Sequence, residues 1–227
     1  MKKICLLLAA LFFMTQPAFS ELFEIEIETG ITSEDKKYLN ADLHSNDTTE
    51  AKPVILIQTP YNKDRMRPIF KEPDIFKQFQ LPIDYYSYHY VVMDWRGFYS
   101  NKDKNIPDHD VDRGSDGYDA VEWIASQDWC NGKVATWGAS ALGLVQYQTA
   151  QRSPRHLVCI IPLVKNYRRT HYQFYYGGVL REEHFNDLIN LGFKVEKVKE
   201  NPNYNFNWKV SVQLTDYAID IDVPVLM

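Results

Sequence analysis

The sequence predicts an α/β fold, in which helices cover both faces of a mostly parallel sheet. Four short apolar runs are typical of strands that are buried on both faces. Segments with helical periodicity separate the later runs, and this alternation of strand and helix favours parallel pairing. Polar residues follow the runs, and such sheets carry their functional sites at the carboxyl ends of the strands. The four runs are Pro53–Ile57, Tyr90–Met93, Lys133–Trp137 and Leu157–Leu163.

Residues 1–20 have the pattern of a signal peptide. Met1–Lys3 supplies two positive charges, Ile4–Met14 is apolar, and Ala18–Ser20 provides the small residues of a cleavage site. The apolar stretch is too short to span a bilayer as a helix, and Cys5 lies too early in it for lipid attachment. We therefore expect an exported bacterial protein, periplasmic or secreted, with no stable membrane anchor.

Charge argues against a nucleic-acid partner. The formal net charge of −5 becomes −7 once the two lysines of the signal peptide are removed. An acidic protein is repelled by phosphate backbones. The length that remains suits one domain of roughly 100–200 residues, and the sequence contains no repeat or low-complexity tract.

The two cysteines of the expected mature chain are Cys130, in a loop, and Cys159, in a strand. Their predicted positions favour two separate thiols, although pairing in an exported protein stays open. Neither has the neighbouring His or Cys residues of a metal site. The sequence therefore predicts no metal and no cofactor.

Two strands are predicted ahead of the first apolar run. Leu22–Glu28 alternates between apolar and acidic residues, with Ile25 and Ile27 on one face, which predicts a half-buried edge strand. Tyr38–Leu43 is predicted to pair with it in antiparallel orientation. The polar residues His44–Lys52 are then expected to form a loop.

Two helices are predicted among the later apolar runs. Ser115–Gln127 has an apolar face, and Ser115 or Asp116 can cap its start. The pattern Leu144–Arg152 predicts the other helix, which ends before Pro154. Each helix lies between two of the apolar runs, as crossover connections between parallel strands require.

A Gly-x-Ser-x-x-Gly turn, Gly138–Gly143, joins the third apolar run to the helix that follows. Its glycines allow strand, turn and helix to approach closely. Ser140 would then lie on a tight bend, where backbone N–H groups point toward any oxyanion that forms. We interpret Ser140 as a catalytic nucleophile. The alternative is an ordinary βα turn in which the serine caps the helix.

Three residues are expected at the same edge of the sheet. Tyr61, Asp94 and Ser140 each follow an apolar run. The carboxyl ends of parallel strands meet at one edge, so these side chains are predicted to lie near a common site.

Four motifs of the chain carry a family resemblance: Thr59–Lys63, Val91–Gly97, Asp119–Val134 and Gly138–Gly143. They resemble motifs of the CocE/NonD family of α/β-hydrolases, to which the Xaa-Pro dipeptidyl-peptidases also belong. The motifs occur in the family's order, and the resemblance is spread over residues 42–163. The resemblance implies an α/β-hydrolase fold with a helical lid insertion and, in this chain, a sheet that is incomplete at the C-terminus. It also implies a serine hydrolase that acts on ester or amide bonds of a small-molecule or peptide substrate.

The resemblance assigns roles to three residues. Ser140 would attack the substrate carbonyl and form an acyl-enzyme. Tyr61 would donate its phenolic O–H to the oxyanion, and the backbone N–H of Ala141 would be the second donor. Tyr61 could instead be a rim aromatic in a proline-initiated turn. The family commonly has tyrosine where this chain has Ala141, which predicts a smaller wall of the acyl pocket and an altered acyl preference.

The resemblance also implies a triad acid and a triad histidine, and both are absent from this chain. In the family the acid follows a strand similar to Val223–Met227. The chain is therefore expected to be an N-terminal fragment that stops inside this strand and leaves the sheet with an unpaired edge. Asp216, Asp220 and Asp222 precede the strand and are expected to be solvated loop residues.

The histidines that are present are poor substitutes for the missing base. His44 and His109 are expected in polar loops, His89 at the start of a strand, and His156 at the end of the sheet away from Ser140. His171 lies in the expected lid, from which it can reach a site, and so stays open as a base. His184 lies in the same segment. More often a histidine among aromatic residues serves packing.

The expected organisation has four parts. Residues 1–20 are the signal peptide and residues 21–164 the first part of the hydrolase domain. Residues 165–215 are the lid, and residues 216–227 begin the next core strand.

The expected lid opens with Tyr167–Tyr176, a cluster of aromatic and basic residues. This cluster forms either a wall of the substrate pocket or the packing face of the lid helices. It is followed by no carboxylate before Glu182, whereas an enzyme that binds a free α-amino group needs acids to pair with the ammonium. The composition therefore favours an ester or amide acyl hydrolase over an aminopeptidase.

Two other functions are alternatives to a serine hydrolase. A catalytically inactive remnant or binding module of the same fold would keep the pocket and lack turnover. Nucleotide binding by an unrelated Rossmann-like fold is disfavoured, because no G-x-G-x-x-G motif or phosphate loop follows any predicted strand.

Overall fold

The structure is a computed structural model of the chain. It describes residues 20–71, 83–104, 112–166, 168, 170–193, 195–214, 216 and 220–226. The signal-peptide prediction and His109 lie outside these residues.

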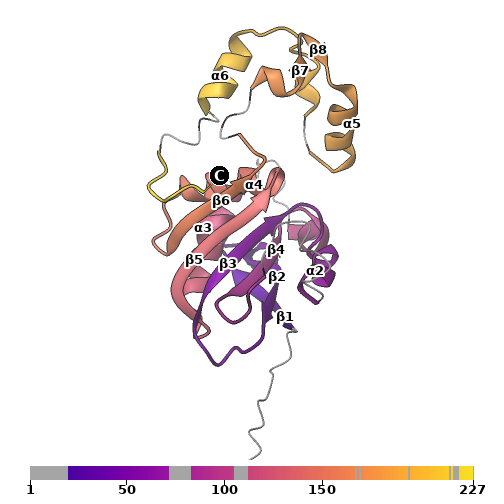
Figure 1. Ribbon diagram of the computed structural model, residues 1–227. Coiled ribbons are helices and arrows are strands. Elements are labelled where there is room, and N and C mark those ends of the chain that lie inside the picture. Colours follow the sequence, from indigo (N-terminus) through magenta and orange to yellow (C-terminus); the bar gives the residue numbers. More distant parts are fainter. Residues whose placement is uncertain are drawn as a thin grey trace, which may run out of the picture.

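A six-stranded sheet forms the centre of the molecule, in the order β1-β2-β4-β3-β5-β6 (Figure 1). The first two strands are antiparallel to their neighbours, and β4, β3, β5 and β6 are parallel to one another. The predicted α/β class and the mostly parallel sheet are therefore confirmed. The strands are β1 (Glu21–Glu28), β2 (Tyr38–Ser45), β3 (Lys52–Thr59), β4 (His89–Asp94), β5 (Cys130–Ala139) and β6 (Leu157–Leu163).

Helices pack on both faces of this sheet. The longer ones, α3 (Arg113–Ala125) and α4 (Ala141–Ala150), cover one face. The short helix α2 (Arg67–Lys71), which the sequence pattern did not predict, contributes Phe70 to a second cluster on the other face. The remaining short helices of this part are α1 (Glu34–Lys37), η1 (Lys63–Arg65) and η3 (Tyr99–Lys104).

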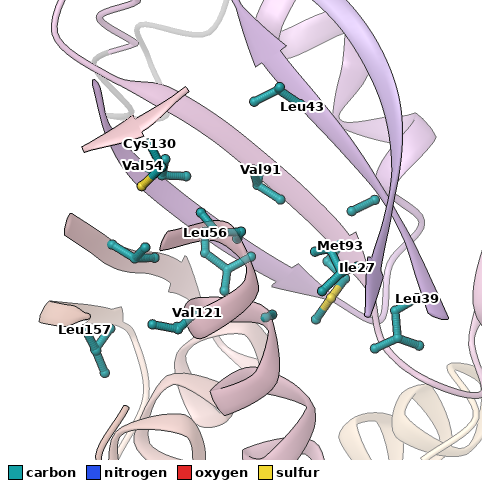
Figure 2. Close-up of a cluster of buried hydrophobic side chains, with 14 of the residues drawn as sticks. Ile27, Leu39, Leu43, Val54, Leu56, Val91, Met93, Val121, Cys130 and Leu157 are labelled. Atoms are coloured by element: carbon teal, nitrogen blue, oxygen red, sulfur yellow. The ribbon is translucent and has the colours of Figure 1, made fainter. Parts of the chain in front are cut away.

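The alternation of side chains along the strands explains why two apolar clusters form. On β3, Val54 and Leu56 point into the cluster under α3 and α4, whereas Ile57 points into the cluster with Phe70. Figure 2 shows the first cluster, to which β4 contributes Val91 and α3 contributes Val121. Because the central strands are apolar on both faces, they need a cover on both sides.

Two sequence expectations about this part are wrong. His44 was expected in a polar loop, but β2 continues to Ser45, and His44 is 1 % exposed and stacks on Phe70 with ring centroids 4.1 Å apart. The start of α3 is capped by Asp112, whose side chain accepts a hydrogen bond from the N–H of Ser115. Asp116 is instead buried against Arg96, because a tertiary ion pair outweighs its local capping preference.

The two cysteines lie on neighbouring strands and are free thiols, as expected from their positions. Cys130 begins β5 and is buried, and Cys159 lies opposite Ala135 within β6. Burial raises the pKa of both thiols. A raised pKa keeps a thiol protonated and unreactive at neutral pH.

Residues 165–215 form a separate group of short elements beyond one end of the sheet (Figure 1). They have an apolar cluster of their own, centred on Phe174, Phe185 and Trp208. The elements are η4 (His171–Gln173), β7 (Tyr175–Tyr176), β8 (Val179–Leu180), α5 (Glu182–Asn190), η5 (Glu196–Val198) and α6 (Phe206–Leu214).

The last described residues return to the sheet. Val225 forms an isolated parallel bridge with Ile160 of β6. The N–H of Ile160 donates to Pro224 O at 3.0 Å, and the N–H of Leu226 donates to Ile160 O at 2.9 Å. The residues expected to begin a further core strand thus pair with β6.

Candidate active site at the carboxyl ends of β3, β4 and β5

Tyr61, Asp94 and Ser140 follow three neighbouring parallel strands. Thr59 at the end of β3 pairs with Asp94 at the end of β4. Ser140 follows β5, which lies beside β3 on its other side. The structure therefore brings all three residues to one edge of the sheet, at the end over which residues 165–215 lie (Figure 1).

Ser140 occupies a sharp turn between β5 and α4. Its φ of 57° and ψ of −114° lie outside the regions that L residues usually adopt. The turn is held by a hydrogen bond of 3.0 Å from the Ser140 N–H to Leu163 O. The Ser140 side chain is exposed and makes no capping hydrogen bond to α4. The interpretation of this serine as an ordinary helix cap is therefore wrong, because its hydroxyl group is not used by the helix.

The two glycines of the turn are required by close packing. Gly138 has a φ of +147°, and a Cβ there would lie 2.4 Å from Leu142 Cβ. A Cβ on Gly143 would lie 2.9 Å from Lys165 Cβ and 3.2 Å from Gly138 O. Such distances are far below van der Waals contact, so any larger residue would displace the turn.

Tyr61 and Ala141 belong to one apolar cluster. Trp95, Ala141 and Val145 form its buried part, and the half-buried ring of Tyr61 packs against them. The N–H of Tyr61 donates to Thr59 Oγ1 at 2.9 Å, which fixes the turn after β3. Ala141 is the first residue of α4, so its own N–H has no acceptor within the helix. The two residues that the resemblance names as oxyanion donors therefore share one cluster, and Ala141 directly follows Ser140 in the chain.

A buried ion network anchors the loop that carries Tyr61. Lys63 Nζ lies 2.7 Å from Asp42 Oδ1, and Arg67 Nε lies 2.7 Å from Asp42 Oδ2. Asp42 is fully buried and Lys63 is 5 % exposed. Burial raises the pKa of Asp42, but the hydrogen bonds from Arg67 and Lys63 outweigh this effect and lower it overall. Lys63 belongs to the motif Thr59–Lys63, but the sequence did not predict its role, because its partner Asp42 is distant in the chain.

Asp94 organises loops instead of facing the open site. It is fully buried, and its carboxylate accepts hydrogen bonds from the Lys63 N–H at 2.8 Å and from Ser100 Oγ at 2.7 Å. Burial raises the pKa of Asp94, although these donors oppose the shift. The side chain thus ties the loop after β3 to the loop after β4.

Phe193 connects residues 165–215 to this edge of the sheet. Its ring centroid lies 6.0 Å from that of Trp95 and 6.2 Å from that of Phe98. The Phe193 and Trp95 rings meet edge-on, and such a contact adds to the energy of apolar burial. Phe193 also packs against the cluster of Phe174, Phe185 and Trp208, so it belongs to both groups.

No histidine of the described residues hydrogen bonds to Ser140. His171 Nε2 contacts Pro202 O at 2.8 Å, and its ring stacks on Tyr175 with centroids 4.7 Å apart. His156 contacts Glu122 at 2.8 Å, next to the start of β6. His171 therefore has a packing role within residues 165–215, in line with the more common function of a histidine among aromatic residues.

A cleft of the described residues is not lined by Ser140. It has a volume of ≈ 440 Å³, and its walls include Glu24, Asn40, Lys63, Arg67 and Ser100. Its lysine and arginine side chains are already paired, since Arg67 contacts Glu24 and Asp42, and Lys63 contacts Asp42. The conformation of Ser140 and its neighbours, and not cleft volume, identifies the candidate site.

The fold and the strand-end turn define the protein as an α/β-hydrolase. Residues 37–217 match the X-Pro dipeptidyl-peptidase (S15) family, and the chain belongs to this family. In the residues that the structure describes, no helix is both long and apolar enough to cross a membrane.

Relatives of known name agree with this assignment. The cocaine esterase of Rhodococcus sp. (strain MB1 Bresler) is 31 % identical over 124 residues, which are 55 % of this chain and 21 % of that protein. Among solved structures, an aminopeptidase from the marine sediment archaeon Thaumarchaeota archaeon has a TM-score of 0.62 at 17 % identity, covering 94 % of this chain and 43 % of its own. A CocE/NonD family hydrolase from Staphylococcus aureus has a TM-score of 0.60 at 20 % identity. The match covers 90 % of this chain and 40 % of that hydrolase. At these identities the structural likeness shows the fold alone, and the chain spans about a fifth of the cocaine esterase.

Proposed function

We propose that the protein is an exported serine hydrolase that cleaves ester or amide bonds of a small-molecule or peptide substrate through an acyl-enzyme. The observation that carries this proposal is the conformation of Ser140, exposed and strained at the head of α4 with its hydroxyl group unused by the helix. Strain of this kind persists where the surrounding structure enforces it and is concentrated at functional sites. The family assignment and the name of the cocaine esterase support the reaction class.

In the proposed reaction, Ser140 Oγ attacks the carbonyl carbon of the substrate and passes its proton to a general base. The carbonyl oxygen becomes an oxyanion, which accepts hydrogen bonds from the Tyr61 hydroxyl and the Ala141 N–H. Collapse of this intermediate expels an alcohol or amine, which takes the proton from the base. A water molecule then attacks the acyl group and regenerates Ser140.

The base and its orienting acid are proposed to come from a part of the protein that follows these 227 residues. Two observations support this: the chain spans 21 % of the cocaine esterase, and no histidine of the described residues contacts Ser140. Without a base, a serine hydroxyl is a weak nucleophile. The lack of a contact between Ser140 and any histidine of the described residues also favours the second candidate function, an inactive binding module of the same fold.

A fluorophosphonate probe separates the two candidates. We expect the purified gene product to be labelled at one serine, and the Ser140→Ala variant to lose the label, whereas Ser126→Ala, at an exposed serine beyond α3, retains it. An unlabelled gene product would contradict the hydrolase and support the binding module. If label is present, its loss in His171→Gln would assign the base to His171, contrary to its packing role.

Substrate preference and export have separate tests. The lack of acidic residues between positions 167 and 181 supports esters or simple amides over peptides with a free amino terminus. Faster turnover of nitrophenyl esters than of Xaa-Pro nitroanilides is therefore expected.

The proposed export is supported by the start of β1. This strand begins at Glu21, directly after the expected cleavage site, so removal of the signal peptide would leave the strand whole. Mass spectrometry of the periplasmic protein should give a mature N-terminus at Glu21, and an uncleaved cytoplasmic product would contradict export.

A further inference from the structure

Gln146 is the most densely hydrogen-bonded buried amide near Ser140 among the described residues. It lies on α4 six positions after Ser140 and is 1 % exposed. Its Nε2 donates to Leu142 O at 2.9 Å, to Gly138 O at 3.1 Å and to Ile161 O at 3.2 Å. Its Oε1 accepts from the Ile161 N–H at 2.8 Å and from Thr136 Oγ1 at 3.1 Å. One side chain therefore joins β5, the turn, α4 and β6.

The orientation of this amide is fixed by its partners. The backbone N–H of Ile161 can only donate, so the oxygen of Gln146 must face it. The NH₂ group then faces the three carbonyl groups, which can only accept. No other residue type of similar size supplies an acceptor and a two-proton donor at these positions.

The pairing of β6 explains why an amide is needed here. Ile160 uses its N–H and C=O groups to pair with Pro224 and Leu226 on the outer side of β6. Successive residues of a strand direct these groups to opposite sides, so those of Ile161 point toward β5. They also bond to the side chain of Gln146. The pairing of β5 with β6 continues past this point to Ala139 and Leu163, next to Ser140.

We propose that Gln146 is a positioning residue for the nucleophile. Its amide ties α4 to the end of β5 and to β6, and so fixes the distance between the ends of the two strands. The Ser140 N–H depends on this distance, since it donates to Leu163 O, two residues after Ile161. Gln146 thereby holds Ser140 in its strained conformation without contacting substrate. The catalytic part of this proposal rests on the proposed hydrolase function, whereas the structural part does not.

The kinetic test compares two substitutions on the same helix of the gene product. Gln146→Met keeps the length of the side chain and removes all five hydrogen bonds. It should lower kcat by about 10- to 100-fold with KM changed less than twofold, because a small misplacement of a reacting group is costly. Gln148→Met has the same chemistry two positions further on, on another face of α4. It should leave kcat within twofold of the unchanged protein.

A milder variant keeps the test meaningful if Gln146→Met does not fold. Thr136→Val removes only the hydroxyl donor to Gln146 Oε1 and preserves shape. It should lower kcat by a few-fold with KM unchanged. Equal kcat values for the unchanged protein and for both Gln146→Met and Thr136→Val would overturn the proposal, as would a loss in Gln146→Met that Gln148→Met reproduces.

Amide hydrogen exchange tests the same proposal without turnover. In Gln146→Met the Ser140 N–H should exchange at least tenfold faster, because its bond to Leu163 O opens more often. Amides in the β1–β2 pair, far from the site, should exchange at unchanged rates. Unchanged protection of Ser140 would overturn the positioning role. If the unchanged protein proved inactive, the proposed function would fail while the exchange result still decided whether Gln146 positions Ser140.

Discussion

Ser140 combines a strained backbone with an exposed side chain. A non-glycine residue in such a conformation costs of order 1–3 kcal/mol, which the surrounding structure must offset. The hydrogen bond from its N–H to Leu163 O and the contacts around Gly138 and Gly143 provide this support. Tyr61 packs in the same apolar cluster as Ala141, the residue that follows Ser140. We propose these two residues as the source of the oxyanion donors.

Tyr61→Phe removes one of these donors and keeps the packing of the ring. If Tyr61 donates to the oxyanion, kcat should fall by about 10²–10³-fold with little change in KM, since the hydrogen bond forms only in the transition state. Steady-state kinetics on a nitrophenyl ester measure both constants. Tyr86→Phe is the control, because Tyr86 is 66 % exposed and outside the site. A kcat within threefold of the unchanged protein would exclude Tyr61 as a donor.

β5, the turn and α4 act as one unit. The turn needs Gly138 because Leu142 of the following helix folds back over it, and it needs Gly143 because Lys165 and Leu163 O approach from the end of β6. The side chain of Gln146, on α4, adds hydrogen bonds to Gly138 of β5 and to Ile161 of β6. Residues 165–215 contribute one aromatic ring, Phe193, to the contact with Trp95 and Phe98. The turn that carries Ser140 is therefore supported mainly by the sheet and α4.

Gly138→Ala should destabilise the protein by about 3 kcal/mol or more, since its Cβ would collide with Leu142 Cβ. Urea unfolding measures this change. Gly177 is a matched control: it has a φ of +60° in the turn between β7 and β8, with no atom within 4 Å of an added Cβ. Gly177→Ala should cost only about 1 kcal/mol, the backbone contribution alone. Equal costs for the two variants would show that close packing does not explain Gly138.

Across the whole molecule, buried ionisable groups make stability depend on pH. His44 is enclosed between β2 and Phe70, and burial lowers its pKa to about 4 despite the nearby charge of Asp42. Burial also lowers the pKa of His89. A histidine whose folded pKa is below its unfolded value of 6.5 binds more protons in the unfolded state. Stability is therefore fully present above pH 6.5 and is lost as the pH falls.

For His44 the loss should amount to about 3 kcal/mol between pH 6.5 and pH 4. His44→Phe, which keeps a ring against Phe70, should flatten this part of the pH profile of the free energy of unfolding. The lowered pKa of Asp42 adds a further loss only below pH 3.8, so the two effects occupy separate ranges. An unaltered slope in His44→Phe would assign the acid sensitivity to other groups.

Much of the fold could be predicted from local patterns. β6 matches its predicted bounds, Leu157–Leu163, and the edge pair β1–β2 follows from alternation of apolar and acidic residues. The turn at Ser140 was also predictable, because two glycines at fixed spacing between a strand and a helix have few other conformations. These features depend on interactions between residues that are close in the chain.

The roles of buried polar residues were not predictable in this way. His44 and Asp116 were assigned by local preference to a loop and a cap, but distant partners, Phe70 and Arg96, place both in the interior. The sequence by itself determined the class of fold and the position of the candidate nucleophile. Only the tertiary structure decided that Lys63 pairs with Asp42 and that Gln146 joins α4 to β5 and β6, because a hydrogen bond between distant residues leaves no periodic signal in the chain.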